Sequence, residues 1–513
     1  MKKLSSILAL TLIISVAASA LGVDEPEIKS IGNQAIEFNN YSGPHKRIDS
    51  AQSITKIGSD LGAKITPSQP ANVGNRNKYY VVHAVDPNEK GKLDADILYI
   101  GRDATVDHIN NIRRIIAGYL MSAYNYSQKD AQTLAVFITV YNAVYRGKID
   151  VFNSKYKSVV TKNLSSANCG LSVNYYDWPG KTEIVIPLYD VNNGGLSTVD
   201  TSTITDSKVV EKMKDDDDRN VDSRKDMVDL KERESDEAAE KAQDAKKDAV
   251  EKQKEADQAK KEAEDAKKKA EENPDDKKAQ QEAEDAKKKA DEKQKEADDA
   301  NKKAEEEQKF ADKKQKEAQD ERKEIAKDQD AVQKKIEEES KMPSDYGIII
   351  SDEPQQLSRL VKFNVDTGDI IKNSPVTVIR NRTIYHAPSQ AFMAVAGVNS
   401  ANGAIKLVLI DQDKMEIFRE SNETLAADSV LVRDGSDYYC VIDDNGKWVV
   451  AKYDETLTLK LKSPVSVMSS TPICIADTGI VVTSPSGKLI LLSKQNLKQI
   501  SNPNKNNNDA NAK

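Results

Sequence analysis

The sequence predicts a multidomain protein in which a very long central charged α-helix joins an N-terminal α+β domain to a C-terminal all-β, propeller-like domain of about four repeats. Three observations support this class. The central run is almost wholly Ala, Lys, Glu, Asp and Gln, the N-terminal part has ordinary globular composition, and the C-terminal part repeats every 41–47 residues. The expected boundaries are a signal peptide at 1–20, the N-terminal domain at 21–206, the helix at 207–343, the propeller-like domain at 344–500 and a disordered tail at 501–513.

The central run extends from about Asp222 to Lys341 and contains no Gly, one Pro (Pro274) and one aromatic residue (Phe310). Ala, Lys, Glu and Gln are strong helix formers, whereas Gly and Pro are the main helix breakers. A straight helix of this length would extend roughly 170–180 Å at 1.5 Å per residue. No globular core needs so long a helix, so we expect an extended spacer rather than part of a compact body.

Alanines in this run recur every seven residues, which is typical of a coiled-coil seam. The seam is weak, because each buried methylene contributes only ~0.8 kcal/mol and alanine buries little area. We therefore favour a solitary or loosely paired helix, stabilised by Glu–Lys pairs, over a thin Ala-seamed coiled coil. A disordered charged linker is the third interpretation. The two series, one on each side of Pro274, are Ala242, Ala249, Ala256, Ala263 and Ala270, and then Ala283, Ala290, Ala297, Ala304, Ala311, Ala318, Ile325 and Val332. Before Pro274, Ala245, Ala259 and Ala266 repeat at the same seven-residue spacing three positions further on.

One interruption divides the run, at Asn273-Pro274-Asp275-Asp276. Asn is a good N-cap, Pro suits the first helical position and Asp suits the first turn, so one helix ends here and another begins. The joint is either a kink or a hairpin that folds the second half back. We predict a kink near Pro274, because the loop looks short for a hairpin.

The N-terminus has the features of a secretory signal peptide. Two lysines precede an apolar run from Leu4 to Ala18, and small residues at Ala18, Ala20 and Gly22 suit cleavage after Ala20 or Gly22. An uncleaved membrane anchor is the alternative. No other stretch is apolar enough to span a membrane, so we expect a secreted protein that is periplasmic or associated with the cell envelope. The formal net charge of −8 argues against a general nucleic-acid binder.

The chain has three cysteines, Cys169, Cys440 and Cys474. An odd number at wide spacing is neither a disulfide framework nor a zinc site. Cys440 and Cys474 belong to one predicted domain and could pair, which would leave Cys169 free. The alternative is that all three are thiols.

The N-terminal domain alternates strand and helix patterns. Two β-branched runs, Lys78–Val85 and Ala95–Gly101, predict paired strands, and Glu183–Leu188 predicts a third. Asp107–Tyr126 carries apolar residues at helical spacing, and Ser127 has the position of an N-cap for a second helix. These elements predict a small α+β domain with a helical core.

The polar residues do not form a recognisable active site. The four histidines are dispersed, and His108 follows Asp107 at a helix start, where a capping role is expected rather than catalysis. No phosphate loop, nucleophile elbow or metal motif is present. We therefore predict a protein that is not an enzyme, with no catalytic, cofactor-binding or metal-ligating residue and no cofactor. None of the histidines, His45, His83, His108 and His386, belongs to a catalytic or metal-ligand pattern, and the tyrosine spacing suits core and rim positions for Tyr119, Tyr124, Tyr126, Tyr141 and Tyr145.

The C-terminal part contains equivalent hairpins that begin near Leu360, Leu407, Trp448 and Leu489. A period of this size with several short strands is typical of propeller blades. A sandwich of meandering hairpins is the alternative. Two dipeptides, Asn402-Gly403 and Asn445-Gly446, are expected hairpin turns, and Asp443–Gly446 only superficially resembles a calcium loop, because the other ligand positions are missing.

Four sequence words resemble the spirochaetal 83/100-kilodalton antigen family: IEFNNYSGP at 36–44, GYLMSAYNYS at 118–127, TVYNAVYRGKID at 139–150 and WPGKTEIVIPL at 178–188. The order of signal peptide, N-terminal domain, charged helix and C-terminal domain is similar too. The resemblance implies an extracytoplasmic, envelope-associated, immunogenic protein. It brings no established activity, cofactor or catalytic residue.

The leading functional hypothesis is a non-catalytic envelope protein with two docking domains separated by a helical spacer. The alternatives are a ligand-binding or enzymatic propeller with a helical tether, and a periplasm-spanning coupling device. The expected partners are envelope proteins or peptidoglycan, without nucleic acid and without a transmembrane segment after signal cleavage. The expected state is a monomer or a weak coiled-coil dimer.

Overall fold

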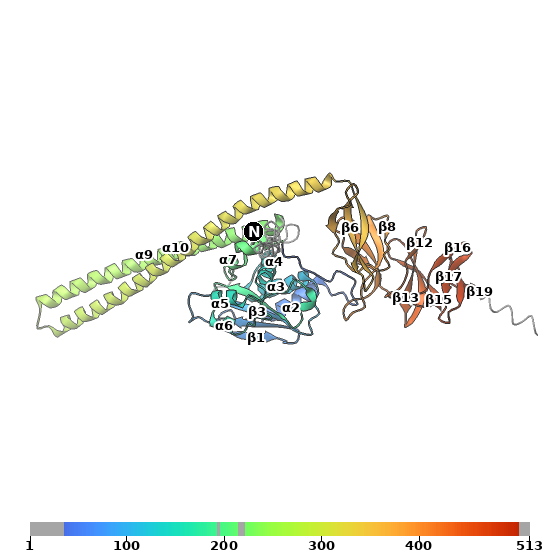
Figure 1. Cartoon of the computed structure of the whole chain (residues 1–513). Coiled ribbons are helices and arrows are strands. Elements are labelled where there is room, and N and C mark those ends of the chain that lie inside the picture. The colour runs from blue at the N-terminus through green and yellow to red at the C-terminus, as the bar shows by residue number, and fades with distance from the viewer. Residues whose placement is uncertain (1–34, 192–194, 214–220, 502–513) are drawn as a thin grey trace, which may run out of the picture.

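The computed structural model describes residues 35–191, 195–213 and 221–501 of the 513-residue chain. The predicted signal peptide at 1–20, and all but the first residue of the predicted tail at 501–513, lie outside the described residues. The described parts form an elongated molecule, in which a helical pair points to one side and a row of β-sheets to the other (Figure 1).

The N-terminal domain has one antiparallel sheet with the strand order β1-β2-β3-β4, with helices α2, α3 and α4 over one face (Figure 1). The predicted strands and helices are confirmed, and Ser127 caps α4 through the backbone N–H of Asp130. The elements are α2 (Ala51–Gly62), β1 (Ala71–Gly74), β2 (Tyr79–Ala84), β3 (Asp94–Ile100), α3 (Ile109–Tyr124), α4 (Gln128–Val144), α5 (Ile149–Lys155), α6 (Ser158–Thr161), η1 (Tyr175–Asp177), β4 (Thr182–Leu188), α7 (Thr201–Ile204) and α8 (Ser207–Lys212).

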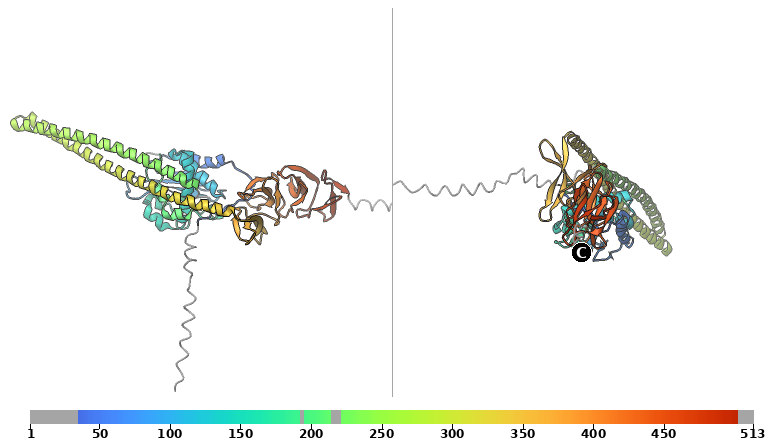
Figure 2. Two further views of the ribbon diagram at one scale, coloured as in Figure 1. Left: turned by 90° about the horizontal axis from the view of Figure 1, so that it is seen from above. Right: turned by 90° about the vertical axis from the view of Figure 1, so that its right-hand side faces the viewer.

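The central run folds into two long helices, α9 (Val221–Glu272) and α10 (Lys277–Ser340), which lie antiparallel as a hairpin (Figures 1 and 2). The predicted kink near Pro274 is therefore wrong. The turn between the helices has only four residues, 273–276. It is stabilised by the Asp276 carboxylate, which caps α10 by accepting from the N–H groups of Lys278 and Ala279. Salt bridges across the pair include Lys289 to Glu262 at 3.1 Å and Lys293 to Glu255 at 2.9 Å.

The preferred prediction, a solitary or loosely paired helix, is also corrected, because α9 and α10 pair closely with each other. The two alanine series of the hairpin face each other, so that one arm covers the weak seam of the other without a second chain. The predicted seven-residue phase is confirmed by burial, since the buried residues include Ala242, Ala249, Ala256, Ala297, Ala311, Ala318 and Ile325. The coiled-coil character thus lies within one chain.

The C-terminal part consists of four consecutive antiparallel sheets, each a simple meander. The predicted repeat is confirmed, because equivalent strands β6, β10, β14 and β18 begin at residues 357, 406, 447 and 489. The sheets are β5 (Ser344–Asp352), β6 (Leu357–Asn364) and β7 (Ile370–Asn373); β8 (Tyr385–Ala387), β9 (Ala391–Ala396), β10 (Lys406–Asp411) and β11 (Ile417–Glu420); β12 (Val432–Asp434), β13 (Asp437–Asp444), β14 (Lys447–Tyr453) and β15 (Leu459–Ser466); and β16 (Cys474–Ala476), β17 (Gly479–Thr483), β18 (Leu489–Leu492) and β19 (Gln499–Ser501).

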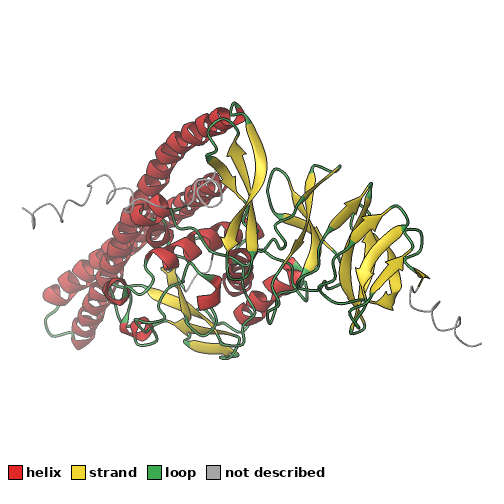
Figure 3. Cartoon of the chain, turned by 45° about the vertical axis from the view of Figure 1, so that its right-hand side comes forward, coloured by secondary structure: helices red, strands yellow, loops and turns green. Residues whose placement is uncertain are grey.

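These sheets do not close into a propeller within the described residues; they follow one another in a row (Figure 3). One apolar cluster lies between each successive pair of sheets, and none joins the fourth sheet to the first. In β9, for example, Phe392 and Ala394 face the first sheet while Met393 and Val395 face the third. Alternation along the strand therefore buries both faces of an inner sheet. The repeats were predicted correctly. The prediction of a closed propeller was wrong, because closure needs a contact between the first sheet and the fourth.

Three smaller expectations concern turns, thiols and membranes. Asn445 and Gly446 both have positive φ, 56° and 81°, which confirms a hairpin turn between β13 and β14. Cys169, Cys440 and Cys474 are all free thiols, so the Cys440–Cys474 bridge is not formed. Among the helices in the described ranges, none is both long and apolar enough to cross a bilayer.

Removing one seven-residue unit from each arm of the hairpin, Ala249–Glu255 together with Glu296–Lys302, should shorten the arm by ~10 Å and leave both end domains folded. The seam phase and the pairing of the arms are preserved, because the two units lie opposite each other. Small-angle X-ray scattering measures the maximum dimension. Removing Ala249–Glu255 alone is the control, and it should disturb the hairpin register. An unchanged dimension after the paired deletion would contradict the hairpin.

Candidate functional site

The segment at 36–49, called the strap here, connects the N-terminal domain to the β-sheets. On the domain side, the N–H of Asn39 donates to the carbonyl of Val173 at 2.7 Å, and the N–H of Tyr41 donates to the carbonyl of Asp107 at 2.8 Å. The Asn40 side chain accepts from the N–H of Ile109 at the start of α3. The strap is therefore held along its length by backbone groups of the N-terminal domain.

On its other side the strap is built into the first two β-sheets. The Tyr41 ring is buried in the apolar cluster between these sheets, at 6% exposure, and its hydroxyl donates to the carbonyl of Pro44 at 2.8 Å. The N–H of Lys46 donates to the carbonyl of Asn402, and the N–H of Ala404 donates to the carbonyl of Pro44. The strap thus adds its own backbone to the connection between β9 and β10.

Two glycines allow this close approach. A Cβ at Gly43 would lie 2.7 Å from Val378 Cγ2, and a Cβ at Gly403 would lie 2.8 Å from the Tyr41 hydroxyl. Such distances are not tolerated, so glycine is required sterically. Asn402-Gly403, predicted as a hairpin turn, is instead part of the wider β9–β10 loop that receives the strap.

The strap overturns the expectation that a helical spacer separates two domains. Because α10 runs back along α9, the β-sheets begin beside the N-terminal domain rather than far from it (Figure 2). The two parts then touch directly through the strap and through Asn402, whose Nδ2 lies 3.4 Å from the carbonyl of Thr105. The hairpin is a projecting arm.

A cleft of about 450 Å³ opens at this junction and is called the joint cleft here. One wall is aliphatic and comes from α2 and α3, with Ile54, Ile57 and Ile115, while the strap supplies a polar rim. The full lining is His45, Lys46, Arg47, Ile48, Asp49, Ala51, Ile54, Ile57, Tyr79, Thr105, Val106, Asp107, Asn111, Arg114, Ile115, Ala401 and Asn402.

The rim of the joint cleft carries more cations than anions. Arg47 pairs with Asp49 at 3.0 Å, and His45 Nε2 lies 3.3 Å from Asp107 Oδ2. Neither Lys46 nor Arg114 is paired with a carboxylate in the described ranges; Arg114 donates to the Asn111 amide oxygen at 2.7 Å. A cleft with an aliphatic wall and two unneutralised cations suits a ligand that carries a carboxylate or phosphate beside an apolar group.

The His45–Asp107 contact makes the junction sensitive to pH. The hydrogen bond to Asp107 raises the pKa of His45, with Glu420 adding to the shift and burial and Lys406 opposing it. A raised folded-state pKa means that the stabilisation is complete below the unfolded value, about 6.5, and is lost as the pH rises through the folded value. Since the histidine is about one-third exposed, the effect should stay below about 1 kcal/mol.

We expect His45→Gln to flatten the pH dependence of thermal stability above pH 6.5 relative to the parent protein. The difference between the two melting curves isolates His45 from the other histidines. His386→Gln, at an exposed position on β8, is the matched control and should follow the parent. Parallel curves for parent and His45→Gln would show that the contact does not stabilise the junction.

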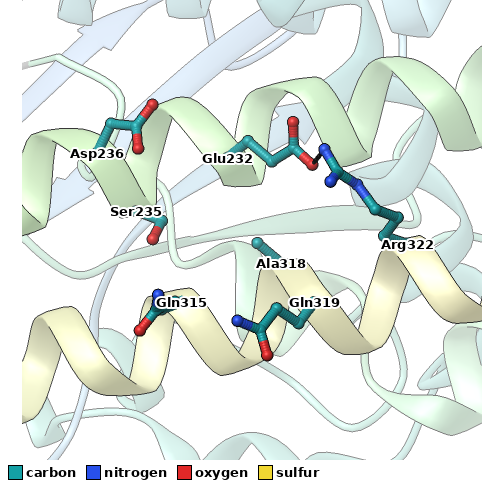
Figure 4. Close-up of a pocket in the computed structure, with 7 residues that line it drawn as sticks. All are labelled: Glu232, Ser235, Asp236, Gln315, Ala318, Gln319 and Arg322. Carbon is teal, nitrogen blue, oxygen red and sulfur yellow. Dashed lines mark ion pairs between the residues drawn. The ribbon is translucent and has the colours of Figure 1, made fainter.

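A second pocket, of about 300 Å³, lies between the arms of the hairpin near its base (Figure 4). Figure 4 shows Glu232 of α9 reaching across to Arg322 of α10, with which it forms an ion pair. The space exists because Ser235 and Ala318 are small. With a polar lining of Glu232, Ser235, Asp236, Gln315, Ala318, Gln319 and Arg322, it is a gap between helices rather than a binding site.

Below this pocket, the base of the hairpin is anchored by buried charges. The Glu234 carboxylate accepts from Lys314 Nζ at 3.0 Å and from the Thr201 hydroxyl at 2.8 Å. Glu321 forms an ion pair with Arg224 at 2.7 Å and accepts a hydrogen bond from Lys231 Nζ at 3.3 Å. Burial raises the pKa of Glu234, and Lys314 and Thr201 oppose this shift. Paired charges therefore help to dock the arm, which the sequence had not indicated. They act beside apolar contacts, since Met227 and Leu230 of α9 are buried in the core of the N-terminal domain and the Phe310 ring of α10 stacks on Tyr189.

His83 belongs to a buried polar network and is not accessible to a substrate. Its Nδ1 lies 2.5 Å from Asp96 Oδ1 and its Nε2 lies 2.7 Å from the carbonyl of Pro67, while the Tyr124 hydroxyl donates to Asp96 Oδ2 at 2.5 Å. Burial by itself would lower the pKa of His83, but the hydrogen bond to Asp96 and its charge outweigh it and raise the pKa. The network joins β2, β3 and α3 inside the domain.

The other residues considered as site candidates in the sequence have structural roles. His108 accepts from the N–H of Asn110 as the N-cap of α3, as predicted, and burial lowers its pKa to about 4. Asp443 accepts from the N–H of Gly446 within the β13–β14 turn. No group of three or more His, Cys, Asp or Glu in the described residues is arranged to hold a metal ion. The tyrosines of the predicted stripe, Tyr119, Tyr124, Tyr126, Tyr141 and Tyr145, are all core residues.

Sequence reasoning missed the strap and the joint cleft. The residues were visible in the word IEFNNYSGP at 36–44 and in Asn402-Gly403, but nothing in either stretch indicates that they meet across more than 350 residues. Sequence reasoning also missed α2, which supplies the aliphatic wall. The signal that the sequence does contain is the word at 36–44, which has apolar residues and a glycine although no helix or strand is predicted there.

A family model described as Borrelia P83/100 protein matches residues 25–345 and residues 272–473. No curated protein matches the chain. The matched ranges together include the strap, the hairpin and the first three of the four sheets, and they end just before β16, where the fourth sheet begins.

Proposed function

Because the chain belongs to the Borrelia P83/100 protein family, we propose that it is a non-catalytic docking protein of the cell envelope, which binds a partner in the joint cleft and projects the helical hairpin as a rigid arm. Membership is consistent with an antigen. The observation that carries the proposal is the strap, which joins the two domains into one body and leaves an open cleft across the junction.

The chemistry of the cleft supports binding rather than turnover. His45 is engaged with Asp107, and the more strongly hydrogen-bonded pair, His83 and Asp96, is inside the core. The cations that remain are the exposed Lys46 and the half-buried Arg114, which are suited to hold an anion. An aliphatic wall beside them adds affinity for an apolar neighbour of that anion.

The proposed partner is an envelope component that presents a carboxylate or phosphate next to an apolar group. Envelope proteins and the carboxylate-bearing peptides of peptidoglycan both have this chemistry. The hairpin favours docking over a periplasm-spanning device, because α9 extends about 78 Å at 1.5 Å per residue and α10 then returns the chain to its starting side.

Site-specific crosslinking in intact cells tests the proposal. A photoactivatable residue at Ile48, which is 69% exposed on the rim of the cleft, should capture a defined envelope component identified by mass spectrometry. The same residue at Val250, half-exposed on the distal arm, is the position control. Capture at Ile48 should fall at least tenfold in the Lys46→Glu, Arg114→Glu double variant.

Lys64→Glu is the charge control, since Lys64 is exposed on the same domain but outside the cleft. It should leave capture unchanged. Capture that is equal at Ile48 and Val250, or that survives the double charge reversal, would overturn the proposed docking site. A chemical turnover by the purified protein that is lost in the same double variant would overturn the non-catalytic role.

A further inference from the structure

The first β-sheet has an open edge where each of the other three sheets has a fourth strand. Because β6, β10, β14 and β18 are equivalent, β5 is equivalent to β9, β13 and β17. In the later sheets β8, β12 and β16 pair with the outer side of that strand, but no described strand pairs with the outer side of β5. Within the part of the chain that the structure describes, β5 pairs with β6 alone. At nine residues it is also longer than β8, β12 and β16, each of which has three.

Hydrogen bonds on the far side of β6 show which β5 groups face the open edge. Ser358 exchanges backbone bonds with Ile379 at 2.8 and 3.0 Å, and the Leu360 carbonyl accepts from the N–H of Ser374, so both point away from β5. In an antiparallel pair, two opposite residues either both direct their N–H and C=O groups toward each other or both direct them away. Their partners, Ile350 and Ile348, therefore direct N–H and C=O to the open side.

The side chains of this edge lack the usual protection. No charged residue lies between Tyr346 and Ser351, and Ile349 and Ile350 are 41% and 49% exposed. Edge strands are normally guarded by Lys, Pro or bulges, because an unguarded edge pairs with another chain. The one irregularity in the pairing of β5 with β6 lies near the end of the strand, between Ile350 and Asp352. The outer strand β15 in the third sheet, by contrast, carries Lys460, Lys462 and Pro464.

Gly347 adds an independent sign of a close neighbour. A Cβ at this position would meet only the Phe363 ring, at 3.6 Å, which is an ordinary contact, and the residue has no positive φ. The fold of the single chain therefore does not need a glycine here. Glycine inside a strand often marks the close approach of another backbone.

We propose that β5 pairs antiparallel with β5 of a second copy of this chain, in the register centred on Ile348. In this register the strand is its own complement: Tyr346 lies opposite Ile350, and Gly347 lies opposite Ile349, whose side chain fills the space above the glycine. Ser344 lies opposite Asp352, so no carboxylate faces another. A shift of one residue would oppose Asp345 and Asp352 and turn the outward N–H groups away from their acceptors.

The pairing is sterically accessible. In the right-hand view of Figure 2, the yellow-orange first sheet stands out from the rest of the β-sheets, away from the row that follows it. The resulting continuous sheet would have six strands, three from each copy, and would cover Ile349 and Ile350 on its two faces. This inference does not depend on the joint cleft, which lies in another part of the molecule.

Analytical ultracentrifugation of the purified protein should show a concentration-dependent dimer. Ile350→Lys should weaken it at least tenfold, since a charge would then enter the paired edge opposite Tyr346 of the second copy. Ile350→Pro, which removes an outward N–H and no hydrogen bond to β6, should do the same and serves as the second variant. Ile370→Lys is the matched control, because Ile370 is 47% exposed on β7, the opposite edge of the same sheet.

Hydrogen exchange reports the edge directly. The peptide that covers β5 should become protected as the protein concentration rises, and should lose that protection in Ile350→Lys at unchanged melting temperature. A monomer at all concentrations with fast exchange would overturn the proposal. So would a dimer that Ile350→Lys leaves intact, or protection of β5 that is independent of concentration, which would mean that a segment of the same chain covers the edge.

Discussion

Replacing Tyr41 by Ala should release the N-terminal domain from the β-sheets. The ring is buried between the first two sheets while its backbone is bonded to Asp107 of the other domain, so one side chain serves both bodies. Truncation of a buried aromatic residue costs about 3–5 kcal/mol. Small-angle scattering should show a larger and less uniform molecule, and limited proteolysis should cut the strap.

Two variants define this effect. Tyr41→Phe keeps the ring and removes only the hydroxyl that donates to Pro44, so it should cost about 1 kcal/mol and leave the scattering profile unchanged. Tyr176→Ala removes a tyrosine that is 61% exposed nearby and should have little effect. If Tyr41→Ala scatters like the parent and resists the protease equally, the strap does not hold the two bodies together.

Replacing Glu234 by Ala should detach the base of the hairpin from the N-terminal domain. Lys314 would then remain buried without its closer carboxylate partner and would keep only Glu317, at 3.6 Å; breaking a buried ion pair on one side costs about 3–5 kcal/mol. Hydrogen exchange should accelerate in the parts of α9 and α10 nearest the domain, and the urea midpoint should fall. Glu264→Ala, at an exposed site on the distal arm, is the control.

The paired variant Glu234→Met, Lys314→Met separates the two possible roles of these charges. Replacing both members of a buried pair by apolar residues is often neutral or stabilising, so the urea midpoint should return to or exceed that of the parent. A paired variant as unstable as Glu234→Ala would mean that the Thr201 hydrogen bond, and not the ion pair, carries the anchor.

Several features of this molecule follow from the sequence by itself. The seven-residue phase of the alanines predicted which positions of the arms are buried, because helix geometry places every seventh residue on one face. The Ser127 and His108 caps and the Asn445-Gly446 turn are likewise local, since each is decided by a few consecutive residues. The four-fold repeat was visible for the same reason: each meander is built from neighbouring strands.

The tertiary structure decided whatever depends on residues far apart in the chain. The turn at 273–276 is compatible with a kink or a hairpin, and only the pairing of the two alanine seams selects the hairpin. The sheets do not close into a ring, because no apolar cluster of the described residues joins the fourth sheet to the first. Glu234 and Lys314, 80 residues apart, look like solvated charges in the sequence and become an anchor only when the arm folds back onto the domain. The strap and the joint cleft are of the same kind, since the burial of Tyr41 requires Val378, and a sequence does not show which distant surface will cover an apolar side chain.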